Sequence, residues 1–168
     1  MDASGHIRLE RVTGQSAGVI RGWLKRPEIN GWWGSQAAAE AGLSIALESA
    51  SAVCRLIVIE GQCAGYVHAV DAAMWGELPD GIEPGTLDVD LFIAVPELRA
   101  KGYGQAALQL LADEVFSTTL ATALSVFVTI KNEAAVRAYE KAGFRWVKVW
   151  HDPISGPSWL LTLERPRR

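Results

Sequence analysis

A glycine-containing turn in the middle of the chain constrains the fold most strongly. The sequence Arg99-Ala100-Lys101-Gly102-Tyr103-Gly104 follows a β-rich run at 86–95 and begins a segment with helical spacing at 102–118. Glycines at such a turn let the backbone approach a ligand, and the first N–H groups of the helix point outward at the positive end of the helix dipole. Arg99 and Lys101 add two positive charges. The turn indicates a pyrophosphate site, although a tight turn without a ligand would need the same glycines.

Apolar periodicity predicts a mixed α/β (α+β) protein. The expected strands span 7–12, 53–60, 63–70, 86–95, 123–130, 144–150 and 159–163, and the expected helices span 16–26, 35–49, 102–118 and 132–142. Gly61-Gln62 is expected at a hairpin turn, and residues 152–157 are expected to join the last two strands. Residues 71–85, rich in Gly and Pro, form a long loop, which is more often functional than idle. This order favours one mainly antiparallel sheet.

Composition and charge exclude several classes of protein. The chain has 168 residues, 49% of them hydrophobic, so we expect one domain spanning 1–168 in a reduced, cytoplasmic setting. Its apolar runs are too short for a membrane span, and its charge pattern is not that of a nucleic-acid-binding protein. The window 71–90 carries six acidic residues and no basic one, namely Asp71, Glu77, Asp80, Glu83, Asp88 and Asp90. That window suits a cationic partner, or is a solvated acidic loop.

Two sequence motifs, one after the other along the chain, resemble those of the GCN5-related N-acetyltransferase (GNAT) superfamily. The strand at 90–95, followed by Pro96 and Arg-x-x-Gly-x-Gly, resembles its acetyl-CoA motif, and Asn132–Phe144 resembles its Asn-x-x-Ala-x-x-x-Tyr-x-x-x-Gly-Phe segment. The resemblance implies a sheet of about six to seven strands flanked by about four helices. It also implies a binding site for acetyl-CoA, without a metal, formed by Phe92, Ile93, Ala94, Val95, Arg99, Ala100, Lys101, Gly102, Tyr103, Gly104, Gln105, Asn132 and Tyr139.

Asn132 and Tyr139 are seven residues apart and therefore share a helix face. The resemblance implies that the asparagine contacts the CoA arm and that the tyrosine protonates the departing thiolate. A phenol of pKa about 10 can donate to a thiolate whose conjugate acid has a pKa of about 8.5. Two structural roles remain open at this point: Asn132 as a helix N-cap and Tyr139 as a core aromatic.

The strand at 86–95 places acidic side chains on one face. Alternation puts Leu87, Val89, Leu91 and Ile93 in the core, and the other face carries Thr86, Asp88, Asp90 and Phe92. An amine acceptor arrives as ammonium and loses a proton before it attacks, so a carboxylate there, Asp90 above all, is the candidate catalytic base. Solvated acids at an exposed strand end are the alternative.

The segment Trp23–Gly34 narrows the resemblance to bacterial aminoglycoside 6′-N-acetyltransferases, which carry a similar Trp-Leu…Arg…Ile…Trp-Trp-Gly stretch in one wall of the acceptor site. Aromatic faces and carboxylates attract cationic sugars. The candidate acceptor-binding residues are Trp32, Trp33, Asp71, Glu77, Asp88 and Asp90, with one of the two tryptophans expected in the core. Trp23, Trp146 and Trp150 are expected to pack in the core. One departure is that residues 126–131 hold no acid, whereas the aminoglycoside enzymes carry Asp-Pro there.

The resemblance predicts an enzyme that transfers acetyl from acetyl-CoA to a polycationic small molecule, most simply the 6′-amine of an aminoglycoside. Attack would be direct within a ternary complex, with Asp90 and Tyr139 as catalytic groups and strand N–H groups polarising the carbonyl. The alternatives are another amine (a protein N-terminus, a polyamine or a siderophore amine) and a non-catalytic acyl-CoA-binding module. Many relatives form homodimers, and antibiotic resistance is a property of the narrower resemblance.

Overall fold

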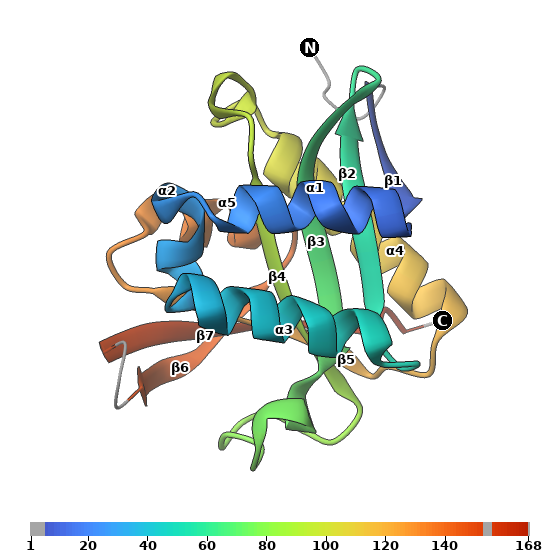
Figure 1. Cartoon of the computed structure of the whole chain (residues 1–168). Helices are drawn as coiled ribbons and strands as arrows, with labels where there is room; N and C mark the ends of the chain where they lie inside the picture. Colours follow the sequence, from blue (N-terminus) through green and yellow to red (C-terminus); the bar gives the residue numbers. More distant parts are fainter. Residues whose placement is uncertain (1–5, 153–155, 168) are drawn as a thin grey trace.

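Seven strands form one twisted sheet in the order β1-β2-β3-β4-β5-β7-β6 (Figure 1). The structure is a computed structural model that describes residues 6–152 and 156–167, so the predicted turn residues 153–155 lie outside the described residues. The strands are β1 (Ile7–Arg11), β2 (Val53–Ile59), β3 (Gln62–Asp71), β4 (Thr86–Ile93), β5 (Ala123–Thr129), β6 (Arg145–Asp152) and β7 (Gly156–Glu164).

Five α-helices accompany the sheet in the described part of the chain. They are α1 (Gly14–Leu24), α2 (Pro27–Asn30), α3 (Gln36–Glu48), α4 (Tyr103–Thr118) and α5 (Glu133–Lys141), with 3-10 turns η2 (Gly31–Trp33), η3 (Ala72–Trp75) and η4 (Pro96–Leu98). None of these helices is long and apolar enough to cross a membrane. The expected order of strands and longer helices is confirmed.

Neighbouring strands pair antiparallel, with one exception in the middle of the sheet. β4 and β5 run parallel and pair over three residues each, Thr86–Asp88 with Ala123–Ser125. β4 also pairs with β3 as far as Ile93, and β5 pairs with β7 as far as Thr129. The mixed, mainly antiparallel sheet is therefore as predicted.

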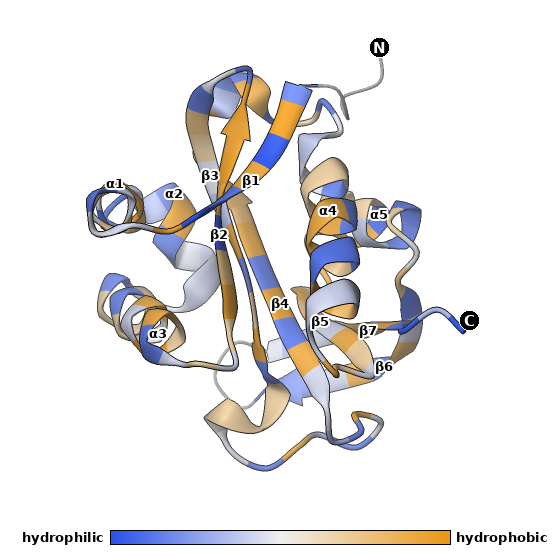
Figure 2. Ribbon diagram, turned by 90° about the vertical axis from the view of Figure 1, so that its right-hand side faces the viewer, coloured by the Kyte–Doolittle hydropathy of each residue, from blue (hydrophilic) through white to orange (hydrophobic). Residues whose placement is uncertain are grey.

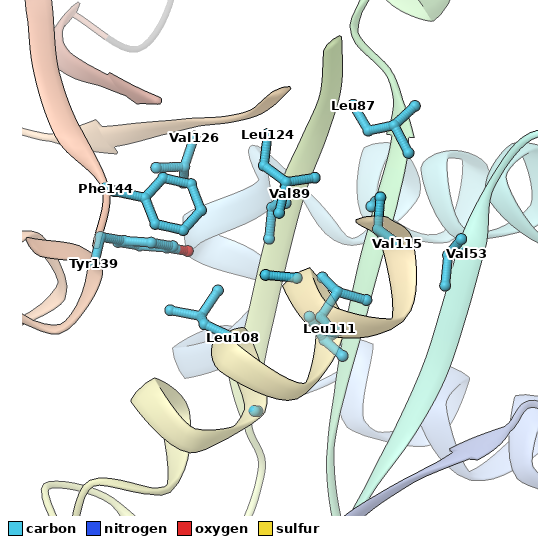
Figure 3. Packing of buried hydrophobic residues seen from close by; sticks show 14 of the residues in the cluster. Val53, Leu87, Val89, Leu108, Leu111, Val115, Leu124, Val126, Tyr139 and Phe144 are labelled. Carbon is cyan, nitrogen blue, oxygen red and sulfur yellow. The ribbon is translucent and has the colours of Figure 1, made fainter. Parts of the chain in front are cut away.

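Helices cover both faces of the sheet and enclose two apolar clusters. Figure 2 shows α1, α2 and α3 on one side of the sheet and α4 and α5 on the other. Successive side chains of β2 point to opposite faces of the sheet and so belong to different clusters. Leu56 and Val58 pack with α1 and α3, whereas Ile57 and Ile59 pack with α4. Figure 3 shows Leu108 and Leu111 of α4 packed among strand side chains. The acidic face of β4 is thus also covered by helices, and not by solvent alone.

Two local differences from the expected elements have clear causes. Pro27 ends the predicted first helix but also starts the extra turn α2, since proline is well tolerated at the first position of a helix. The hairpin turn lies at Glu60-Gly61, one residue earlier than predicted. Both residues have positive φ, 49° and 78°, which is the requirement of a type I′ turn.

The burial of the tryptophans differs from the expectation. Trp146 was expected in the core, but that is wrong: it is 50% exposed on the edge strand β6, stacks on Trp159 with ring centroids 4.0 Å apart and donates its indole N–H to Glu140. Trp23 is half-buried and packs edge-on against Phe92. Trp150 is half-buried and contacts Phe127. The β6–β7 pairing is irregular between Trp146 and Lys148, and such a bulge re-aims side chains in a way that sequence alternation does not predict.

Candidate active site

The candidate site lies where β4 and β5 part. Their pairing ends at Asp88 and Ser125, yet each strand continues along its outer neighbour. Beyond that point the two strands no longer pair with each other, and backbone groups that are not taken up by a neighbouring strand can bond an inserted extended ligand. A cavity of about 630 Å³ opens there. Its lining includes Glu28, Ile29, Trp32, Trp33, Asp90, Leu91, Phe92, Ile93, Arg99, Ala100, Gly102, Gly104, Gln105, Phe127, Val128, Thr129, Asn132, Ala134, Arg137, Ala138, Tyr139 and Lys141.

The turn before α4 opens into this cavity as the sequence predicts. Gly102 is the N-cap in a left-handed conformation, φ 85°, and makes no side-chain cap hydrogen bond. The first N–H groups of α4 are therefore left to a ligand. Arg99 also lines the cavity, and its Nε donates to the carbonyl oxygen of Ile93 at 2.8 Å. Lys101 is exposed and does not line the cavity.

One face of α5 also lines the cavity, next to the start of α4. Asn132 is the N-cap: its Oδ1 accepts from the Ala135 N–H at 3.2 Å, which leaves the amide NH₂ group to other partners. The capping role and the predicted place at the cavity are therefore compatible. Arg137 and Lys141 are four residues apart on α5, so they are neighbours on the helix surface, and both line the cavity. They add two cations to this end of the cavity.

Tyr139 is part of the hydrophobic core and also lines the cavity. Its ring is buried against Phe144, with centroids 5.4 Å apart, and Figure 3 shows its hydroxyl oxygen pointing toward β4. Burial, followed by the nearby Asp90 and Asp88 carboxylates, raises the pKa of the phenol well above 10. The hydroxyl is thus fully protonated at neutral pH and able to donate.

The two carboxyl groups of β4 occupy different positions. Asp90 lines the cavity, and its Oδ1 accepts from the Leu91 N–H at 3.0 Å. Burial and then the neighbouring Asp88 charge raise the pKa of Asp90 to about 8. Asp88 does not line the cavity: it accepts from the Ser125 hydroxyl at 2.8 Å, and burial raises its pKa to about 7 despite that bond. Both groups are half-buried, so the alternative of solvated strand-end acids is wrong.

The wall formed by α2 and η2 carries the two candidate tryptophans. Trp33 is half-buried and packs against Tyr66, His68 and Phe92 at ring separations of 5.3–6.3 Å. Trp32 is 62% exposed at the edge of the same cavity. The expectation that one of the pair belongs to the core is met in part by Trp33, which packs inward and still lines the cavity.

Seven predicted site residues do not line the cavity: Asp71, Glu77, Asp88, Ala94, Val95, Lys101 and Tyr103. Asp71 instead caps η3, where its Oδ1 accepts from the Ala73 N–H. Glu77 is exposed in the loop that follows. Ala94 is fully buried against α1 and α3. The remaining predicted residues meet in one place although they come from four separate segments.

Several lining residues were missed from the sequence. Arg137 and Lys141 share the helix face of Ala134, so their spacing could have found them. Phe127 and Thr129 alternate onto the face of Ser125, but no sequence signal marks them; the Thr129 hydroxyl is buried and has no hydrogen-bond partner among the described residues. Glu28 also lines the cavity. Within the described ranges, no three His, Cys, Asp or Glu side chains form a metal-binding group.

A titratable residue that the sequence did not single out lies on β3, the strand next to the acidic strand β4. His68 is buried, pairs directly across from Asp90 in the β3–β4 ladder and is hydrogen bonded to the Tyr66 hydroxyl through Nδ1 at 3.0 Å. Burial lowers the pKa of His68 to about 4, so the ring is neutral at neutral pH. Asp90 therefore has no cationic partner on the adjacent position of β3.

Comparison with known families agrees with this geometry. The family model for the acetyltransferase (GNAT) domain matches residues 13–151. The chain therefore belongs to the GNAT acetyltransferase family.

The individual relatives include aminoglycoside acetyltransferases and one polyamine acetyltransferase. The chain is 25% identical to the aminoglycoside N(6′)-acetyltransferase type 1 of Klebsiella pneumoniae over 152 residues, which cover 85% of this chain and 76% of that protein. It is 26% identical to AAC(6′)-Ib in complex with ribostamycin and coenzyme A, at a TM-score of 0.77 over 95% of this chain and 94% of that one. A spermidine N-acetyltransferase from Vibrio cholerae shares the fold alone, with 13% identity, a TM-score of 0.74 and 96% of each chain covered.

The raised pKa of Asp90 predicts a pH dependence of stability. Between the ordinary aspartate pKa, about 4, and the folded value of about 8, the folded protein binds more protons than the unfolded chain, so the free energy of unfolding falls as pH rises. Asp90→Asn removes this loss. We expect the stability of the variant relative to wild type to increase from pH 5 to pH 8 in urea titrations, with Asp113→Asn, exposed on α4, as the matched control. Equal pH slopes for Asp90→Asn and wild type would contradict the burial argument.

Proposed function

We propose that this protein transfers the acetyl group of acetyl-CoA to a primary amine of a polycationic small molecule, specifically the 6′-amine of an aminoglycoside. The single observation that carries the proposal is the cavity between the diverging strands β4 and β5. Arg99, Arg137 and Lys141 line it together with the start of α4, and Asp90 and the two tryptophans line it with α2. An anionic donor and a cationic acceptor thus find complementary groups in one cavity.

The proposed binding of the donor, acetyl-CoA, follows from backbone groups and positive charges of the cavity. The CoA pyrophosphate would bind the N–H groups at the start of α4, where Gly102 leaves room and Arg99 adds charge. The pantetheine arm would lie as an extended segment between β4 and β5, beyond their last paired residues. Asn132 would donate to that arm through its amide NH₂ group, and Arg137 and Lys141 would face the remaining phosphate charge. This arrangement delivers the thioester to the level of Asp90 and Tyr139.

The chemical step then requires a base and an acid, each in its own environment. Asp90 would hold the ammonium group and take its proton, directly or through water, because its pKa near 8 lies close to the operating pH. The amine lone pair attacks the thioester carbon, and N–H groups of β4 stabilise the charge on the oxygen. When the C–S bond breaks, the thiolate would receive the proton of the Tyr139 hydroxyl, which is protonated at neutral pH.

Direct transfer between the two substrates fits the position of the cysteines. Cys54 is buried and Cys63 is exposed, and neither lines the cavity. Burial raises the pKa of the Cys54 thiol, which disfavours the nucleophilic thiolate. A ternary complex is therefore the simpler mechanism.

A second candidate acceptor is a simpler polyamine. The β5 wall of the cavity presents Phe127, Val128 and Thr129, and none of these is acidic. An acceptor with several ammonium groups spread over a wide ring system would meet an uncharged surface on this wall. The relatives with aminoglycoside names favour the first candidate, and the same assay decides between them.

An amine panel tests the proposed function. With acetyl-CoA and kanamycin, we expect release of free thiol well above the rate of thioester hydrolysis, and mass spectrometry should find one acetyl group on the 6′-nitrogen. Spermidine and an N-terminal peptide serve as competing acceptors. Absence of thiol release with every aminoglycoside that carries a 6′-amine would contradict the proposal that the acceptor is an aminoglycoside. Turnover of spermidine alone would instead support a simple polyamine as the acceptor.

Two variants test the assigned acid and base. Asp90→Asn should lower kcat by about 10²-fold or more, the usual contribution of a positioned general base, while acetyl-CoA binding measured by calorimetry stays close to wild type. Tyr139→Phe should lower kcat less, because water can protonate the thiolate, and should leave the KM for the acceptor unchanged. Wild-type turnover in Asp90→Asn would remove this carboxylate from the mechanism.

A further inference from the structure

Asp90 and Phe127 stand at the same level on the two strands that diverge. The last paired positions are Asp88 on β4 and Ser125 on β5, and the hydrogen bond between these two side chains shows that both point to the same face of the sheet. Successive side chains of a strand alternate between faces, so Asp90 and Phe127, each two residues further along, share that face. Both line the cavity. An amine held beside Asp90 therefore has the Phe127 ring as its neighbour on the β5 side.

The Phe127 ring belongs to an aromatic wall that continues across the sheet. It contacts Trp150 of β6 over the intervening strand β7, with ring centroids 6.1 Å apart and ring planes at 61°. Both residues are half-buried, so each ring keeps part of its surface free of protein contacts. We call this pair, Phe127 and Trp150, the aromatic wall. It was not predicted as part of the site, because the two residues meet only through strand pairing.

The aromatic wall suits an uncharged ring better than further ammonium groups. The lining residues of β5 are Phe127, Val128 and Thr129, and none of them is acidic. The Lys148 Nζ lies 5.9 Å from the centroid of the Trp150 ring, so a cation already occupies the position that an ammonium group would take there. An aromatic ring placed on this wall would instead bury apolar surface and pack edge to face against Phe127.

We propose that the protein also acetylates primary monoamines that carry an aromatic ring, with the ring bound on the aromatic wall. The inference rests on the acetyl transfer of the proposed function but not on its aminoglycoside acceptor. The nitrogen bonds to the acetyl carbon, and the C–S bond breaks. The nitrogen loses two protons in all: Asp90 takes one before the attack, and the other replaces the proton that Tyr139 gives to the thiolate.

Two monoamines that differ in the ring test this inference. 2-Phenylethylamine carries the ring, and n-butylamine has an alkyl end instead. We expect the wild-type kcat/KM for 2-phenylethylamine to exceed that for n-butylamine by about tenfold, the order of magnitude of one favourable aromatic contact. Phe127→Ala should bring this ratio close to one, chiefly by raising the KM for 2-phenylethylamine. Phe127→Leu, which keeps an apolar side chain without the ring, should lower the ratio less.

Two further variants separate the aromatic wall from a general effect on the sheet. Trp150→Leu should lower the ratio part of the way, because Trp150 packs against Phe127. Trp146→Leu is the matched control on the same strand: its indole is exposed, stacks on Trp159 and does not line the cavity, so the ratio should stay at the wild-type value. Binding of coenzyme A, measured by calorimetry, should be the same in all four variants as in the wild type.

The outcomes distinguish this inference from the proposed function. A wild-type ratio near one, or a wild-type ratio retained in Phe127→Ala and Phe127→Leu, would overturn the inference. Turnover of kanamycin without turnover of 2-phenylethylamine would overturn it as well and leave the proposed function standing. Turnover of 2-phenylethylamine without turnover of any aminoglycoside would support the inference and contradict the aminoglycoside acceptor. Thiol release with neither class of amine would contradict both.

Discussion

The end of pairing between β4 and β5 is the constraint on which the site depends. The Ser125 hydroxyl donates to Asp88 at the last paired position, so this hydrogen bond ties the two strands together where they begin to diverge. Beyond it, β3 holds β4 and β7 holds β5 on their outer edges. The gap is therefore part of the folded sheet, and the α4 turn and one face of α5 both line the cavity that opens there.

The electrostatics of the cavity follow from that geometry. Half-buried carboxyl groups on β4 cost stability when they ionise, and the same cost gives Asp90 a pKa near 8, where it can act as a base at neutral to mildly alkaline pH. A cationic acceptor offsets this cost when it binds, since an opposite charge favours the ionised form. Burial acts in the same sense on Tyr139: it raises the pKa of the phenol, which therefore remains protonated. One acid and one base thus arise from one environment because their charged forms are both disfavoured.

Most of the fold and about half of the site could be predicted from the sequence, and the division has physical causes. Gly102 and Asn132 belong to short motifs that are recognised from residues close together in the sequence, so the positions of these two residues are predictable. Asp71 and Glu77 were predicted from charge alone, which does not say which way a loop directs its side chains. Glu28 and Phe127 enter the cavity through the packing of α2 and the β4–β5 divergence, and neither is visible in local sequence.

A crystal structure of the protein with coenzyme A tests the central claim most directly. The account predicts the pyrophosphate at the N–H groups of residues 102–105, and the pantetheine arm between β4 and β5. The sulfur should lie beside the Tyr139 hydroxyl, on the side of the cavity that Asp90 lines. Coenzyme A bound elsewhere, with the gap between the two strands filled by protein side chains, would contradict the account.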